Sequence, residues 1–191
     1  MSAADRSERT PEASLTFKVR TAGFLFLILV LTAATTEFFA RGKLSSRAIL
    51  VAAVFEVSCM IAVTLLFYVI FRPVDRRLSL LAASLNVVAL ILELLQFLPH
   101  GVNIGLGFHG FYWMLIGYLM FRSAFLPRIL GVLMGIAGLC WLTFVLPAPA
   151  NDLSPYNLAA ALIVQGSVML WLLATGARSS GMVNSLDRPF V

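Results

Sequence analysis

Four side chains that could do chemistry lie within or at the ends of long apolar runs: Glu37, Glu56, Glu93 and His109. Glu56 is the clearest case, because the 24 residues 48–71 around it hold no Lys or Arg and are bounded by Arg47 and Arg72. At about 1.5 Å per residue, a helix of this length crosses the ~30 Å hydrocarbon core of a bilayer. An unpaired carboxylate inside it costs about 2.5–3.5 kcal/mol. We therefore expect Glu56 to face other helices and not lipid.

Glu93 belongs to a stripe of small and polar residues. Ala82, Asn86, Ala89, Glu93 and Gln96 recur at spacings of four and three residues, which places them on one face of a helix. Such a face should point into a helical bundle, where Gln165 from the last apolar run can contact it. The predicted pocket residues are Glu37, Glu56, Glu93, His109, Gln165, Asn86 and Gln96.

Three functions fit this set of residues. Buried carboxylates are typical of proteins that bind or conduct a small molecule, an ion or a proton, and this interpretation is preferred. A metal-dependent membrane enzyme would use nitrogen and oxygen ligands and a bound water as nucleophile; its ligands would be Glu37, Glu56, Glu93 and His109. The sequence has no HExxH motif and no Cys/His cluster, so a bound divalent metal is not favoured. Whether the protein is an enzyme is left open, and a function without catalysis is preferred. In the third interpretation the same groups only hold helices together or regulate.

The composition explains why helices must position these residues. Of 191 residues, 60% are apolar and 12% are charged, and the mean hydropathy is +0.94. Soluble domains are about 45–50% apolar and 25% charged. We therefore predict an all-α integral membrane bundle of six transmembrane helices in one domain, 21–177. The spans are expected at 21–40, 48–71, 78–98, 104–121, 127–146 and 155–175.

The charged residues predict the orientation of this bundle. Eleven of the 14 Lys and Arg residues fall in the two polar tails, 1–20 and 178–191, and in the second and fourth turns. Because positive residues favour the cytoplasmic side, both termini are predicted to be cytoplasmic. The acidic pocket then opens outward, and the expected location is a bacterial cytoplasmic (inner) membrane. Basic residues at the ends of apolar runs do not form the stripe that nucleic acid requires, so no nucleic-acid partner is expected.

Small residues mark a close helix contact in the fifth span. Gly131 and Gly135 form a GxxxG motif, and Gly138 extends the same face. Packing within the chain is the preferred interpretation of this ridge, and a homodimer is the alternative. Besides such a second copy, the lipid bilayer is the only partner that the sequence predicts.

Several stretches resemble one bacterial family of multi-pass membrane proteins, domain-of-unknown-function family 4386. They are TEFFARGKL at 36–44, LLFYVIFRPVDRRLSLLAA at 65–83, GFHGFYWMLIGYLMFRSAFLPRILGVLMGIAG at 107–138 and VMLWLLATG at 168–176. The resemblance implies an all-helical membrane bundle and supplies no activity. The chain departs from the family pattern in a short connection between Lys43 and Arg47, and in Gln165, where relatives often carry a Glu.

Overall fold

The computed structural model describes residues 3–35, 46–95, 104–145, 152–153 and 156–175. Within these ranges the chain is helical and has no strand. The elements are α1 (Ala3–Thr35), α2 (Ser46–Phe71), α3 (Arg76–Leu95), α4 (Ile104–Arg122), α5 (Arg128–Leu142), the short 3-10 helix η2 (Thr143–Val145) and α7 (Tyr156–Thr175).

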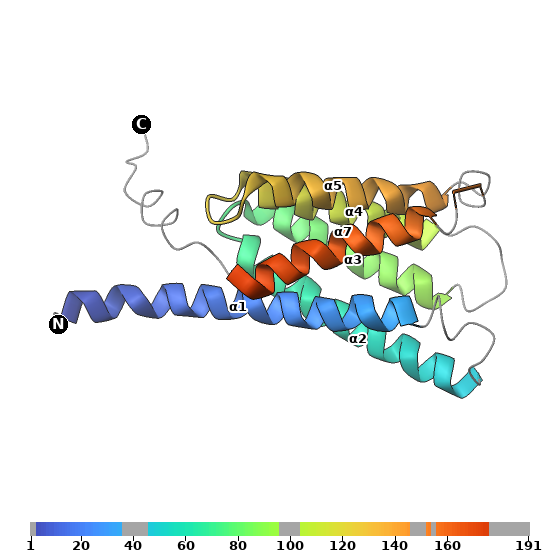
Figure 1. Ribbon diagram of the computed structural model, residues 1–191, viewed down its shortest axis with the longest axis horizontal. Coiled ribbons are helices and arrows are strands. Elements are labelled where there is room, and N and C mark those ends of the chain that lie inside the picture. The colour runs from blue at the N-terminus through green and yellow to red at the C-terminus, as the bar shows by residue number, and fades with distance from the viewer. Residues whose placement is uncertain (1–2, 36–45, 96–103, 146–151, 154–155, 176–191) are drawn as a thin grey trace.

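The six long helices run side by side (Figure 1), and their contacts with one another form a closed ring. Each of them packs against the next one in chain order, and α7 returns to pack against α1. Gly23 of α1 lies against the backbone of Met169 and Leu173 in α7, so the first and last helices approach closely and the ring is shut. Helix α4 is the most deeply buried, with half of its spanning segment inside the bundle. It also touches α2 across the ring.

Large apolar side chains cover the outside of this ring. Every long helix exposes some, for example Phe24, Leu65, Ile91, Phe111, Ile129 and Ile163. A water-soluble monomer rarely exposes apolar surface on this scale. Six helices of the described residues are long and apolar enough to cross a bilayer. The chain is therefore an integral membrane bundle of six transmembrane helices, as the sequence predicts.

From α2 onward the described helices begin within two residues of the predicted spans, and α1 differs; the predicted ends at 98 and 146 lie outside the described residues. The sequence predicts a polar tail to residue 20 and a first span at 21–40, whereas α1 begins at Ala3 and its apolar segment is Leu15–Thr35. The physical reason is that Leu15 and Phe17 continue the apolar run, and Lys18 and Arg20 can extend their charged ends to the membrane surface. Residues 36–40, the end of the predicted span, lie outside the described residues.

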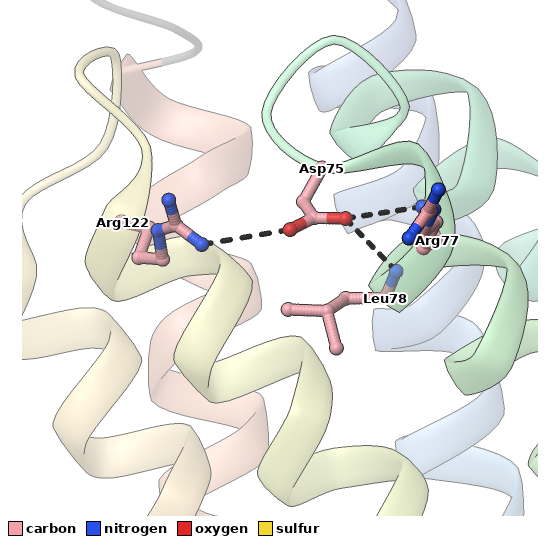
Figure 2. A network of polar contacts seen from close by, with 4 residues as sticks. All are labelled: Asp75, Arg77, Leu78 and Arg122. Atoms are coloured by element: carbon pink, nitrogen blue, oxygen red, sulfur yellow. Dashed lines mark hydrogen bonds and ion pairs between the residues drawn. The ribbon is translucent and has the colours of Figure 1, made fainter.

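The turn between α2 and α3 is fixed by Asp75, and Figure 2 shows its contacts. One carboxylate oxygen accepts hydrogen bonds from the backbone N–H groups of Arg77 and Leu78, each at 3.0 Å, and so caps α3. The other oxygen lies 3.5 Å from Nη1 of Arg122 at the end of α4. Pro73 stops α2 just before this turn, because proline cannot continue a helix. The turn thus ties the ends of α2, α3 and α4 together.

Helices α4 and α5 approach so closely that only glycine fits between them. A Cβ on Gly131 would lie 2.5 Å from the carbonyl oxygen of Gly117, and a Cβ on Gly117 would lie 2.7 Å from that of Gly131. Gly110 and Gly138 face each other in the same way two turns along. Gly135 differs, because a Cβ there would meet nothing within 4 Å. Gly131 and Gly138 therefore face α4 of the same chain, whereas Gly135 contacts Gly117 of α4 only through its backbone and would point a Cβ away from it.

Candidate functional site

His109 of α4 is the centre of a buried polar network. Its Nε2 atom accepts a hydrogen bond of 2.8 Å from Nε1 of Trp113, and its Nδ1 atom lies 3.1 Å from Oδ1 of Asn86 on α3. An indole N–H can only donate, so Nε2 carries no proton and Nδ1–H donates to the Asn86 oxygen. In this arrangement His109 is neutral and both of its ring nitrogens are engaged.

The hydrogen bonds continue from Asn86 to α2. Because its oxygen accepts from His109, its Nδ2 atom is free to donate to Oγ1 of Thr64 at 2.6 Å. The Thr64 hydroxyl in turn donates to the backbone carbonyl of Met60 at 2.7 Å. Asn86 is completely buried and Thr64 nearly so. The hydrogen bonds therefore run in one direction: a side chain of α4 donates to α3, and a side chain of α3 donates to α2.

Gln165 extends the network to α5 and α7. With its amide oxygen toward two indoles, it accepts hydrogen bonds from Trp113 at 3.0 Å and from Trp141 at 3.1 Å. The two donors fix this orientation of the amide. The indole N–H of Trp113 is thus shared between His109 and Gln165. Five helices contribute one side chain or more, and the sixth, α1, adds Phe26, whose ring lies edge-on to Trp113 at 4.8 Å.

Aromatic rings enclose His109 on several sides. The ring centroids of Trp141, Trp113 and Tyr112 lie 5.3, 5.7 and 6.2 Å from that of His109. The hydroxyl of Tyr112 is buried close to Thr64, without a hydrogen bond of regular geometry to a described residue. The rings cover much of the half-buried His109 side chain, and the low polarity of this surrounding strengthens the hydrogen bonds of the network.

The network lies near the middle of the membrane. Asn86 is ten residues beyond Arg76, or about 15 Å along the helix, which is half the thickness of a hydrocarbon core. On the side of the Asp75 turn the bundle is filled by Phe67, Phe71 and Phe125, whose rings contact one another. Polar groups therefore occupy the middle of the bundle, and apolar side chains close it toward the Asp75 turn.

Glu56 and Glu93 form a second group, farther from the Asp75 turn. Glu56 lies two helical turns from Thr64 on α2, and Glu93 lies two turns from Asn86 on α3. Both side chains are half-buried, and their carboxyl groups lie close enough for their charges to interact. Glu93 packs against Gly105 of α4, where a Cβ would lie 3.1 Å from its Cγ atom. Two carboxyl groups from neighbouring helices thus lie at a similar depth in the bundle.

The predicted pocket residues therefore separate into two groups. Asn86, His109 and Gln165 belong to the hydrogen-bonded network, and Glu56 and Glu93 form the acidic pair. Glu37 and Gln96 lie outside the described residues. Among the residues that the structure describes, no three His, Cys, Asp or Glu side chains are arranged to hold a metal ion.

Sequence reasoning missed three members of the network: Thr64, Trp113 and Trp141. Thr64 could have been found because it follows Glu56 by two turns on the same face, and Trp113 because it follows His109 by one. Nothing in the sequence indicated Trp141, because its contact with Gln165 depends on how closely α5 approaches α4.

Six apolar helices with a polar interior define an integral membrane protein of the helical-bundle class. Within it, residues 87–176 match the model of a protein family described as a domain of unknown function, DUF4386. This match confirms, over those residues, the resemblance found in the sequence. The matched residues include α3 from Val87 onward, together with α4, α5 and α7. No curated protein and no solved structure matches the chain.

Proposed function

We propose that this membrane bundle binds a proton or a small cation at the pair formed by Glu56 and Glu93. The observation that carries the proposal is the position of two half-buried carboxyl groups at a similar depth on α2 and α3, which pack against each other. Two negative charges in a poorly solvated site repel each other, and a bound cation or proton removes that repulsion. Ionisable side chains within membrane spans commonly serve proton or ion pathways.

The network around His109 has a supporting role in this proposal. Its side chains satisfy one another, which favours the structural interpretation for Asn86, His109 and Gln165. Through Asn86 and Thr64 it also fixes the two helices that carry the acidic pair. A change at the pair can therefore act on the core of the bundle through α2 and α3.

Two features of the bundle shape the proposal further. The aromatic side chains beside the Asp75 turn pack against one another, and the buried Ser79 and Ser123 there are hydrogen-bonded to backbone carbonyls, so binding is favoured over conduction. The basic turns support a cytoplasmic position for both termini and for the Asp75 turn, so the acidic pair would open outward from a bacterial inner membrane.

A metal-dependent enzyme has weaker support, because both nitrogens of His109 are already hydrogen-bonded.

The test is the stabilisation of the purified, detergent-solubilised protein by Na⁺, K⁺, Mg²⁺ and protons. A ligand present at 100 times its Kd raises the free energy of unfolding by about 2.7 kcal/mol. We expect Glu56→Gln and Glu93→Gln to abolish this response and to keep the helical content. Ser84→Ala is the matched control on α3, because Ser84 is exposed and bonds only to its own helix. An unchanged response in both Gln variants would refute the proposal.

A further inference from the structure

Basic side chains gather at the end of the bundle that holds the Asp75 turn. Arg72 follows α2, Arg76 and Arg77 begin α3, Arg122 ends α4 and Arg128 begins α5. All five are exposed. Among the described residues of these two turns, Asp75 is the single carboxylate. This end of the bundle therefore carries a strong positive charge, which we call the arginine rim.

Asp75 does little to neutralise the arginine rim. One of its oxygens is used by the backbone of α3, and the other reaches only Arg122, at 3.5 Å (Figure 2). In the same view the side chain of Arg77 lies on the far side of Asp75 from Arg122. Such an exposed pair screens little of the surrounding charge. The arginine rim therefore keeps guanidinium groups that no carboxylate neutralises and that can bind an anion.

Two of these arginines lie directly beside lipid-facing aromatic rings. The guanidinium carbon of Arg122 is 5.8 Å from the ring centroid of Tyr118, and that of Arg128 is 5.7 Å from the ring centroid of Phe121. Both rings are about half exposed, at 49% and 43%. A ligand at this position would meet charge at the membrane surface and apolar surface immediately below it.

A helix start adds backbone donors at the same place. Pro127 precedes α5 and provides no side-chain hydrogen bond to cap it. The first N–H groups of a helix need acceptors, and an anion can supply them. Unlike α3, which Asp75 caps, α5 thus presents its uncapped N-terminus next to Arg122 and Arg128.

We propose that the arginine rim binds the headgroup of an anionic phospholipid, with Arg122 and Arg128 as its principal contacts and the acyl chains along the exposed faces of α4 and α5. A lipid is favoured over a free phosphate because apolar surface adjoins the charge: the ring of Tyr118 lies under Arg122, and the ring of Phe121 lies under Arg128. Guanidinium groups pair with phosphate through two parallel hydrogen bonds. The site is independent of the acidic pair, which lies on the far side of the central network.

The experiment is native mass spectrometry of the full chain with phosphatidylglycerol and, separately, phosphatidylcholine. Each basic residue near an anionic membrane surface contributes about a fivefold gain in binding. We expect a preference for phosphatidylglycerol that falls roughly 25-fold in Arg122→Gln/Arg128→Gln. Arg122→Lys/Arg128→Lys keeps the charge and should keep most of the preference. Arg47→Gln is the matched control, because Arg47 is exposed at the opposite end of α2.

Three outcomes would overturn the proposal. The first is an unchanged preference for phosphatidylglycerol in Arg122→Gln/Arg128→Gln, and the second is an equal loss of preference in Arg47→Gln. The third is displacement of phosphatidylglycerol by inorganic phosphate at the same concentration, because the site would then recognise a free anion and not a lipid. A circular dichroism spectrum identical to that of the unmodified protein establishes that each variant is folded.

Discussion

The contact between α4 and α5 gives the sharpest test of this structure, through the single substitution Gly131→Ala. The new Cβ would lie 2.5 Å from the carbonyl oxygen of Gly117 and 2.6 Å from the backbone nitrogen of Phe121. Ordinary carbon–oxygen contacts of this kind are about 3.3–3.6 Å. The two helices must therefore separate by roughly 0.8 Å or more. Because both atoms belong to the backbone, no side-chain rotation can relieve the clash.

The expected cost can be estimated from known effects of overpacking. Inserting one carbon into a well-packed interface costs about 1–3 kcal/mol, and a gap of 0.5–1 Å elsewhere along the interface forfeits a quarter to a half of the dispersion energy there. Gly131→Ala should therefore lower the free energy of unfolding by about 2 kcal/mol or more. The intrinsic preference of helices for alanine over glycine, about 1 kcal/mol, opposes this loss and does not reverse it.

Gly135→Ala is the matched control, because it makes the same chemical change one turn away in the same helix. Its Cβ would meet nothing within 4 Å, so it should be neutral or slightly stabilising. The assay is equilibrium unfolding of the purified protein in mixed micelles, together with its mass in detergent. If Gly131→Ala is as stable as Gly135→Ala, the close approach of α4 and α5 is wrong. A change of oligomeric state in Gly135→Ala would instead favour the homodimer interpretation of this ridge.

The remaining predictions concern the polar network and the Asp75 turn. Asn86→Leu removes two interhelical hydrogen bonds and leaves the His109 N–H without an acceptor, so it should lower the free energy of unfolding by about 2–4 kcal/mol in the same assay. A loss smaller than that of an exposed substitution such as Ser84→Ala would contradict the network. Gln165→Leu and Trp141→Phe should be strongly coupled, by about 0.5–3 kcal/mol in a double-mutant cycle, whereas additivity would show that the two side chains do not interact. Asp75→Ala should cost about 0.5–2 kcal/mol because it removes the cap of α3. Asp75→Asn, which still caps, should cost under about 1 kcal/mol, and equal losses in the two Asp75 variants would mean that the ion pair with Arg122 is what matters.

Much of the site could be anticipated, because membrane helices reveal their inner faces by spacing. The stripe of Ala82, Asn86 and Ala89 was predicted to face the interior, and all three side chains are buried. The pocket residues, however, were expected to act as one acidic site. The structure separates His109 and Gln165, whose polar groups are satisfied by tryptophans, from the acidic pair. Spacing along one helix could not predict this, since it says nothing of the distance to the next helix.

The sequence by itself determined the class of this protein, its six spans and the inner face of α3. These follow from local quantities: the length of each apolar run, the position of arginines and prolines at its ends, and the 3.6-residue period of the helix. Only the tertiary structure decided which polar groups meet. The tautomer of His109 depends on a donor from its own helix and an acceptor on α3, and the position of Trp141 depends on glycines that bring α5 against α4. Such contacts depend on the packing of whole helices, which no single stretch of sequence encodes.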